Sequence, residues 1–151
     1  MKAYLDTSVL VAYYTPEVLS DQAEEAVRGT SNPALSDLCE VELFSALARK
    51  VRLNEIGAED AARVRAIFLE HLERGFFDRL SLGRRHYRLA RDWLARPPVP
   101  LRTLDALHLA AAALAERVVV TADRGQSRAA EALGVSVWRL EEAESSWVSE
   151  P

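Results

Sequence analysis

Short apolar runs alternate along the chain with longer stretches of helical periodicity. Runs rich in β-branched or bulky apolar residues, bounded by polar or turn residues, are typical of short strands. Strands are therefore predicted at residues 2–6, 34–35, 76–82, 118–121 and 135–138. The run from Val118 to Thr121 is the clearest, because consecutive β-branched residues are typical of a strand that is buried on both faces.

The stretches between these strands carry apolar residues at three- and four-residue spacing, which predicts helices. The predicted helices cover residues 8–14, 19–28, 37–52, 58–74, 83–94, 103–115 and 124–133. We expect Ser36 or Asp37 to cap the third of these helices and Thr103 to cap the sixth. The prolines within residues 97–100 predict a stiff connector before the sixth helix.

Strands that alternate with helices predict an α/β fold: a three-layer α/β/α arrangement with a short, mostly parallel central sheet. The chain has 151 residues, 49% of them hydrophobic, which is the usual size of one domain. We expect a single domain at residues 1–140 and a C-terminal tail at residues 141–151. In open sheets of this kind ligands bind at the carboxyl ends of the strands.

Composition indicates the cellular compartment and the way in which the protein could bind nucleic acid. The single Cys39 cannot form an internal disulfide, which indicates a buried thiol in a reduced compartment. No secretory leader pattern and no apolar run of ~18–20 residues are present, so we expect a cytoplasmic protein. The net charge of −4 argues against coating nucleic acid through bulk positive charge. Nearly all cationic residues are nevertheless Arg, which suits bidentate phosphate contacts better than Lys.

Four acidic residues fall where the loops of such a fold would converge: Asp6, Glu42, Asp105 and Asp123. Two carboxylates about 4 Å apart cost roughly 4 kcal/mol at an effective dielectric near 20. A shared pocket would therefore either raise their pKa values or bind a hard divalent cation through oxygen ligands. We predict the cation.

Three of these residues also have a purely structural explanation. Asp6 and Asp123 each follow a predicted strand and precede a helix, where Asp often serves as an N-cap. Asp105 lies in the first turn of its helix, where the helix dipole favours a carboxylate. Thr121 and Asp123 are two residues apart, so in extended geometry their side chains would point to the same side. Position alone does not separate the two interpretations.

Further polar residues near these positions leave alternatives open. Thr7 and Ser8 could cap the first long helix or turn a hydroxyl toward a metal-bound water. On the helix at residues 37–52, the spacing does not decide between Glu40 and Glu42, and either is explained by a solvated carboxylate near a helix N-terminus. His108 is expected to be a hydrogen-bonded packing residue, and we keep it out of the catalytic set.

Four segments together resemble the PIN-domain ribonucleases, most closely the small VapC-type toxins of toxin–antitoxin pairs. They are residues 5–8, 36–43, 105–110 and 121–124, and the resemblance spans almost the whole chain. It implies a metal-dependent endoribonuclease that uses Mg²⁺ or Mn²⁺. The family's catalytic and metal-binding acids map to Asp6, Glu42, Asp105 and Asp123, which settles the choice on the third helix for Glu42.

The resemblance also implies supporting residues and partners. The partners are an RNA substrate, a cognate antitoxin protein and, commonly, a second copy of the chain, with no membrane. Supporting roles near the metal fall to Thr7, Ser8 and Thr121. Arginines that could hold flanking phosphates are Arg49, Arg52, Arg84, Arg85, Arg88 and Arg102. Some relatives carry a further polar or acidic group after the last aspartate, where this chain has Gln126.

Two other functions compete with this interpretation. A phosphatase of the haloacid dehalogenase type also begins with a strand-end aspartate, but its mechanism needs a second Asp where this chain has Ser8. A catalytically silent binding module would use the same acidic pocket to receive a basic segment of a partner. RNA cleavage that depends on a divalent metal separates these possibilities.

Overall fold

The computed structural model describes residues 1–96 and 99–143, which form a five-stranded sheet and seven helices. The strands lie in the order β3-β2-β1-β4-β5, and every neighbouring pair is parallel. They are β1 (Ala3–Leu5), β2 (Ala34–Ser36), β3 (Asp78–Leu80), β4 (Val118–Thr121) and β5 (Val137–Arg139). The predicted α/β fold with a short parallel central sheet is confirmed.

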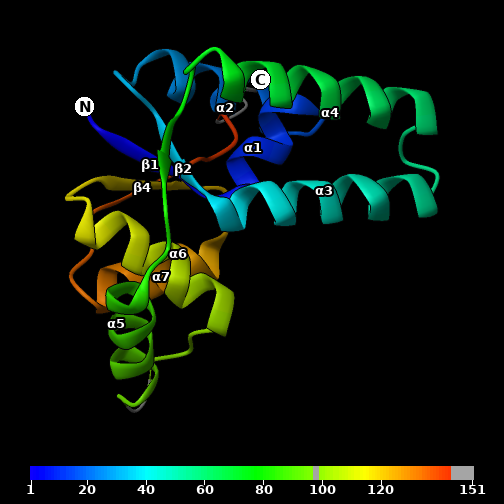
Figure 1. The fold of residues 1–151 in the computed structure, drawn as a ribbon. Helices are drawn as coiled ribbons and strands as arrows, with labels where there is room; N and C mark the ends of the chain where they lie inside the picture. Colours follow the sequence, from blue (N-terminus) through cyan, green and yellow to red (C-terminus); the bar gives the residue numbers. More distant parts are fainter. Residues whose placement is uncertain (97–98, 144–151) are drawn as a thin grey trace, which may run out of the picture.

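The helices cover both faces of this sheet. They are α1 (Thr7–Tyr14), α2 (Ser20–Arg28), α3 (Asp37–Arg52), α4 (Ala58–Glu73), α5 (Arg84–Leu94), α6 (Thr103–Leu114) and α7 (Arg124–Ala132). Figure 1 shows α1 to α4 on one side of the sheet and α5 to α7 on the other. The two longest helices, α3 and α4, lie side by side and extend away from the sheet. The three-layer arrangement is therefore also confirmed.

The core lies where the two middle strands meet the helices. Every residue of β1 is buried, and so are the last three residues of β4. On α6, all residues from Ala106 to Ala112 are buried, because small alanine side chains let this helix approach the sheet closely. Burial of apolar surface at about 25 cal/mol per Å² is the main stabilising contribution.

Two strands and one helix cap differ from the sequence-based prediction in ways that the packing explains. Strand β3 is shorter than residues 76–82, because Phe77 is buried against Phe68 instead of extending the strand. Strand β5 begins at Val137 and not at residue 135, because Val137 is the first residue that pairs with β4. Thr103 does not cap α6: it is the first helical residue, and Arg102 occupies the N-cap with extended backbone. The capping prediction for Thr103 was wrong.

The direction of each element places the candidate residues at one edge of the sheet. Asp6 follows β1 directly, and Asp123 follows β4 after one intervening residue. Helix α6 leads into β4 from the amino edge and is about 18 Å long, so its N-terminal turn with Asp105 lies near the carboxyl edge. Helix α3 starts at the carboxyl end of β2 and carries Glu42 in its second turn.

Other expectations concern the thiol, the connector, the tail and the membrane. Cys39 is fully buried, as predicted. Pro97, Pro98 and most of the predicted tail, residues 144–151, lie outside the described residues. Within residues 1–96 and 99–143, no helix is both long and apolar enough to cross a membrane.

Candidate functional site

Asp6 is the most buried member of the acidic set, with 5% of its surface exposed. Its Oδ1 accepts hydrogen bonds from the backbone amides of Ser8 at 3.0 Å and Val9 at 3.4 Å, so it caps α1. Burial raises the pKa of Asp6, although hydrogen bonds from Ser8 and Thr121 oppose the shift. The capping role predicted from sequence is real, and it leaves Oδ2 on the side of β4.

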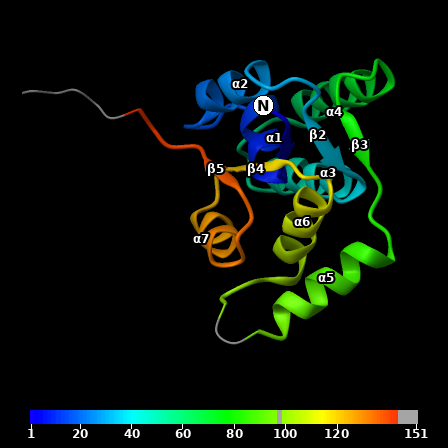
Figure 2. The same cartoon turned by 90° about the vertical axis from the view of Figure 1, so that its left-hand side faces the viewer.

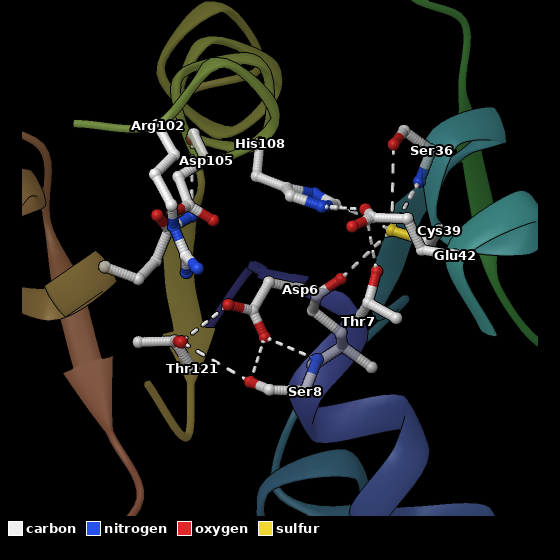
Figure 3. Close-up of polar contacts among 12 residues, drawn as sticks. Asp6, Thr7, Ser8, Ser36, Cys39, Glu42, Arg102, Asp105, His108 and Thr121 are labelled. Atoms are coloured by element: carbon white, nitrogen blue, oxygen red, sulfur yellow. Dashed lines mark hydrogen bonds and ion pairs between the residues drawn. The ribbon is translucent and has the colours of Figure 1, made fainter. Parts of the chain in front are cut away.

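Two hydroxyl groups connect Asp6 to the end of β4. Thr121 Oγ1 donates to Asp6 Oδ2 at 2.5 Å and accepts from the backbone amide of Asp123 at 3.0 Å. Ser8 Oγ donates to Asp6 Oδ1 and accepts from the backbone amide of Ala122 at 2.9 Å. The ends of β1 and β4 are thus fixed to each other through side chains, as Figure 3 shows for Asp6, Ser8 and Thr121.

Glu42 points toward this cluster from α3. Its Oε1 accepts a hydrogen bond from Thr7 Oγ1 at 3.1 Å and another from His108 Nε2. Glu40 instead forms an ion pair with Arg79 at 2.6 Å. Two residues on a helix are about 200° apart around its axis, so only one of these glutamates can face the acidic cluster. The structure places Glu42 there.

His108 lies behind Glu42 in a buried polar network. The Tyr4 hydroxyl lies 2.6 Å from His108 Nδ1 and 2.8 Å from Ser36 Oγ, and 3.4 Å from Cys39 Sγ. Burial alone lowers the pKa of His108, but hydrogen bonds to Cys39 and Glu42 raise it to about 10. A protonated ring donates from Nε2 to Glu42 and from Nδ1 to the Tyr4 oxygen.

This network also fixes the charge of Glu42. Burial by itself raises the pKa of Glu42, but the hydrogen bond and positive charge of His108 outweigh burial, so the pKa is lowered. His108 is a packing residue, as predicted, and it also orients Glu42. Sequence reasoning missed Tyr4. The available signal was a tyrosine inside a three-residue buried strand, where the hydroxyl needs a partner.

Asp105 and Asp123 complete the acidic set from α6 and from the start of α7. Arg102 connects them: its Nε donates to Asp105 Oδ2 at 2.8 Å, and a terminal nitrogen donates to Asp123 Oδ2 at 3.4 Å. The Arg102 side chain is 77% exposed. Asp123 also caps α7, because its Oδ1 accepts from the backbone amide of Gln126 at 2.9 Å.

Gln126 links the segments that carry Asp105 and Asp123 through hydrogen bonds. It is almost fully buried, its backbone amide binds Asp123, and its side-chain Nε2 donates to the Asp105 carbonyl oxygen at 3.4 Å. Its Oε1 is buried without a hydrogen-bond partner among the described residues. A buried polar atom of this kind costs about 1–3 kcal/mol unless a water or ligand satisfies it.

The other predicted phosphate-binding arginines lie farther from the acids. Arg49 and Arg52 are exposed on α3, about 10 and 15 Å along the helix axis from Glu42. Arg84, Arg85 and Arg88 are exposed on α5. Arg102 alone among the predicted arginines contacts the acidic residues in the described part of the chain.

The donor set of this site is suited to a hard divalent cation. The four carboxylates, which follow β1 and β4 or lie on α3 and α6, and the neighbouring hydroxyl groups offer only oxygen atoms, the ligands that Mg²⁺ and Mn²⁺ prefer. In the described residues, no three acidic, His or Cys side chains converge closely enough to hold an ion as they stand. Arg102 supplies positive charge to Asp105 and Asp123 instead, so a cation would replace its guanidinium.

Comparisons with known proteins agree with this fold. The family model described as the PIN domain matches residues 3–132. VapC20 of Mycobacterium tuberculosis, described as a sarcin–ricin loop cleaving toxin, has a TM-score of 0.69 and 18% identity over 91% of this chain and 98% of that chain. FitAcB from Neisseria gonorrhoeae has a TM-score of 0.65 and 20% identity over 91% of this chain and 96% of that one.

VapBC2 from Rickettsia felis, solved with a DNA fragment from its promoter, has a TM-score of 0.66 and 16% identity, over 93% of this chain and 100% of that chain. Among the curated proteins, none matches. At these identities the solved structures show a shared fold. Because the family model matches most of the sequence, the chain belongs to the PIN domain family.

Proposed function

We propose that this protein is a metal-dependent endoribonuclease and the toxin of a type II toxin–antitoxin pair. The observation that carries the proposal is that Asp6, Glu42, Asp105 and Asp123 come from four distant segments and are linked through Thr7, Thr121 and Arg102 at the carboxyl edge of one parallel sheet. Figure 3 shows Asp6, Glu42 and Asp105 with these linking residues. Family membership and the fold shared with VapC and FitAB proteins support it.

The four carboxylates are the groups that would hold Mg²⁺ or Mn²⁺. When bound, such an ion can lower the pKa of a coordinated water and offset negative charge on the phosphate. Gln126 contacts Asp123 through its backbone amide and the Asp105 carbonyl oxygen through Nε2, and its Oε1 has no hydrogen-bond partner among the described residues. No nucleophilic side chain is required.

The surrounding residues orient these carboxylates. Ser8 and Thr121 hold both oxygens of Asp6 in place. Thr7 and His108 hold one oxygen of Glu42, which leaves the other free for a ligand. Arg102 neutralises Asp105 and Asp123 in the metal-free protein and, once displaced, is placed to contact a phosphate.

The decisive experiment incubates purified protein with RNA in Mg²⁺, in Mn²⁺ and in a chelator. We expect cleavage in either metal and none in the chelator. Asp105→Asn should be inactive, whereas Glu40→Gln, which removes a carboxylate from the opposite face of α3, should cleave like the wild type. Inertness under every metal condition, with the protein folded, would exclude the nuclease.

A partner is part of the proposal, because the solved neighbours include toxin–antitoxin complexes. We propose a cognate antitoxin and a homodimer of this chain. Coexpression with the product of the neighbouring open reading frame should yield a stable complex without RNA cleavage. Failure of any small neighbouring protein to bind would exclude the toxin assignment while leaving the ribonuclease intact.

A catalytically silent binding module is the second candidate, and Arg102 is the observation that favours it. The acidic pocket already holds a guanidinium across Asp105 and Asp123, which is how a partner's arginine would be received. In this case an Arg-rich peptide would bind the protein equally well with and without Mg²⁺. For the nuclease, Mg²⁺ should compete with the peptide.

A further inference from the structure

A cationic hollow lies beside the acidic cluster, between α7 and the end of β5. It has a volume of about 310 Å³ and is lined by Arg124, Ser127, Arg128, Glu131 and Arg139. Figure 2 shows α7 beside β5 at the side of the sheet away from β3. Three of the five lining residues are arginines, although the chain as a whole carries a net charge of −4. We call Arg124, Arg128 and Arg139 the arginine groove.

Two of these arginines are available to a ligand. Arg124 and Arg128 are one turn apart on α7, so they project from the same face of the helix. Both are exposed. Within residues 1–96 and 99–143, neither has a carboxylate within ion-pair distance. An anion can therefore bind them without breaking an existing ion pair.

The third arginine connects the groove to the acidic cluster. Arg139 is the register partner of Thr121, the residue that donates a hydrogen bond to Asp6. Neighbouring strands are about 4.8 Å apart, so Arg139 lies one strand away from the centre of the site. Arg124 directly follows Asp123. Arg124 and Arg139 thus lie next to Asp123 in the sequence and to Thr121 in the sheet, and Arg128 lies one turn farther along α7, although none of the four acids lines the hollow itself.

Acidic groups near the groove offset only part of its charge. Glu131 lines the hollow at its far end, and Glu141 forms an ion pair with Arg139. A second hollow of about 530 Å³ shares Arg124 and Arg139 and is also lined by Glu141 and Glu142. Of the two hollows, the one between α7 and the end of β5 is therefore the more cationic.

We propose that the arginine groove binds the phosphodiester backbone of RNA on one side of the cleavage position. This inference rests on the proposed function and names the path of its substrate. A guanidinium matches a phosphate with two parallel hydrogen bonds. Because Arg139 is the register partner of Thr121 and Arg124 follows Asp123, a single RNA strand that reaches the acidic residues would pass close to the groove.

Arginines predicted from sequence clustering lie elsewhere. Arg84, Arg85 and Arg88 are close together in the sequence and lie on α5, whereas the groove takes its arginines from α7 and from the end of β5. Clustering along the chain could not reveal the groove, because the parallel pairing of β4 with β5 creates it.

The test measures binding of a fluorescein-labelled 20-nucleotide poly-uridine to the full chain by fluorescence anisotropy in Mg²⁺. An Asp6→Asn background prevents turnover. In this background, Arg124→Gln with Arg128→Gln should weaken binding about tenfold. The slope of log K against log salt should fall by about 1.4, since each phosphate contact on a single strand contributes about 0.7.

Two further variants control this measurement. Arg128→Gln alone should weaken binding about threefold, and it leaves Arg124, the neighbour of Asp123, unchanged. Arg63→Gln with Arg74→Gln removes the same charge from exposed positions on α4 and should change the dissociation constant less than twofold. Circular dichroism melting checks that every variant is folded.

The outcomes separate the groove from the proposed function. If the wild type cleaves RNA but the Arg124 and Arg128 variant binds poly-uridine with unchanged affinity and salt slope, the groove assignment is wrong and the nuclease stands. If the wild type never cleaves but the same variant loses binding, the groove stands without the nuclease. Poly-glutamate is tested as a competitor of the labelled poly-uridine. If it competes as strongly per charge as unlabelled RNA does, the RNA-binding proposal is wrong, because the groove would then be a site for acidic protein segments.

Discussion

The two halves of the acidic site are held in place in different ways. Asp6 and Glu42, the inner half, are fixed by hydrogen bonds from four side chains of the protein: Ser8 and Thr121 for Asp6, Thr7 and His108 for Glu42. Asp105 and Asp123, the outer half, are joined by the single side chain of Arg102. Asp6 is 5% exposed, whereas the Asp123 side chain is 40% and that of Arg102 77% exposed.

This difference indicates which part of the site is preorganised for a ligand. The inner half keeps its geometry without a metal, because buried hydrogen bonds define it. Asp123 is fixed by the backbone amide of Gln126, but Asp105 and Asp123 are joined to each other only through exposed ion pairs with Arg102 in the described residues, and such pairs contribute only about 0.2–1 kcal/mol. A divalent cation held by these carboxylates would compete with Arg102 for Asp105 and Asp123, whereas the hydrogen bonds of the inner half would remain.

The largest expected effect is the loss of RNA cleavage when a single carboxylate is removed, in one variant from the inner half and in another from the outer half. Asp6→Asn and Asp105→Asn should each lower RNA cleavage at least about 100-fold, beyond the roughly 10–100-fold typical of residues that only orient a ligand. Metal-free melting should separate the halves. Burial raises the pKa of Asp6, so its ionised form costs stability and Asp6→Asn should melt at the same or a higher temperature.

Asp105→Asn loses its ion pair with Arg102 but relieves repulsion from Asp123, so its stability should change by less than about 1 kcal/mol. Glu40→Gln is the matched control for cleavage. Because Asp6 also caps α1, a marked fall in melting temperature for Asp6→Asn would show that its charge stabilises the fold, which would contradict the expected net cost of the buried ionised carboxylate.

The next effect concerns His108, which orients the inner half. His108→Gln removes the charged donor to Glu42 and the partner of the Tyr4 hydroxyl. Cleavage should fall about 10–100-fold, as for other residues that hold a metal ligand in place. Increasing Mg²⁺ should recover part of the rate, which would not happen if His108 took part in the chemistry directly. His86→Gln on α5 is the control.

Arg102 tests the outer half, and the expected change has the opposite sign. Arg102→Met removes a positive charge beside the cation, so the affinity for Mn²⁺ measured by calorimetry should increase roughly tenfold. One unit charge about 6 Å from a divalent ion in water is worth on the order of 1 kcal/mol. Arg91→Met, which loses an exposed pair with Asp92 on α5, should leave the affinity unchanged. Weaker Mn²⁺ binding would show that Arg102 supports the ion instead of competing with it.

The last prediction concerns the dependence of metal-free stability on pH. The pKa of His108 rises from 6.5 to about 10 on folding. A raised pKa stabilises the fold fully below pH 6.5, and this contribution is lost as the pH rises from 6.5 to about 10. Melting temperature should therefore fall over this window in the wild type, and less so in His108→Gln. Equal slopes for the two proteins would contradict the protonated state of His108.

Much of the fold could be predicted because it depends on local signals. Periodicity places all seven helices, and β4 matches its prediction residue for residue. Strand β3 was predicted too long, since its aromatic residues read as extended while Phe77 in fact fills the core. The Thr103 error has a similar origin: a good capping residue was chosen without knowing that Arg102 turns toward the acids.

Local sequence signals predict the candidate site only in part. The sequence alone identified Asp6, Asp105 and Asp123 as strand-end or first-turn carboxylates, and family resemblance was needed to prefer Glu42 over Glu40. Tyr4 and His108 are 104 residues apart, and nothing near either residue in the sequence indicates that they touch. The unpartnered Oε1 of Gln126 likewise becomes visible only when α7 packs against α6.

The sequence by itself determined the order of strands and helices and the acidic residues at their ends, because periodicity, β-branched runs and capping chemistry act over a few residues. The tertiary structure decided which of those acids share a site, which arginine neutralises them and where the arginine groove lies. These properties depend on the pairing of β1 with β4 and of β4 with β5, which brings side chains from distant segments within hydrogen-bonding distance.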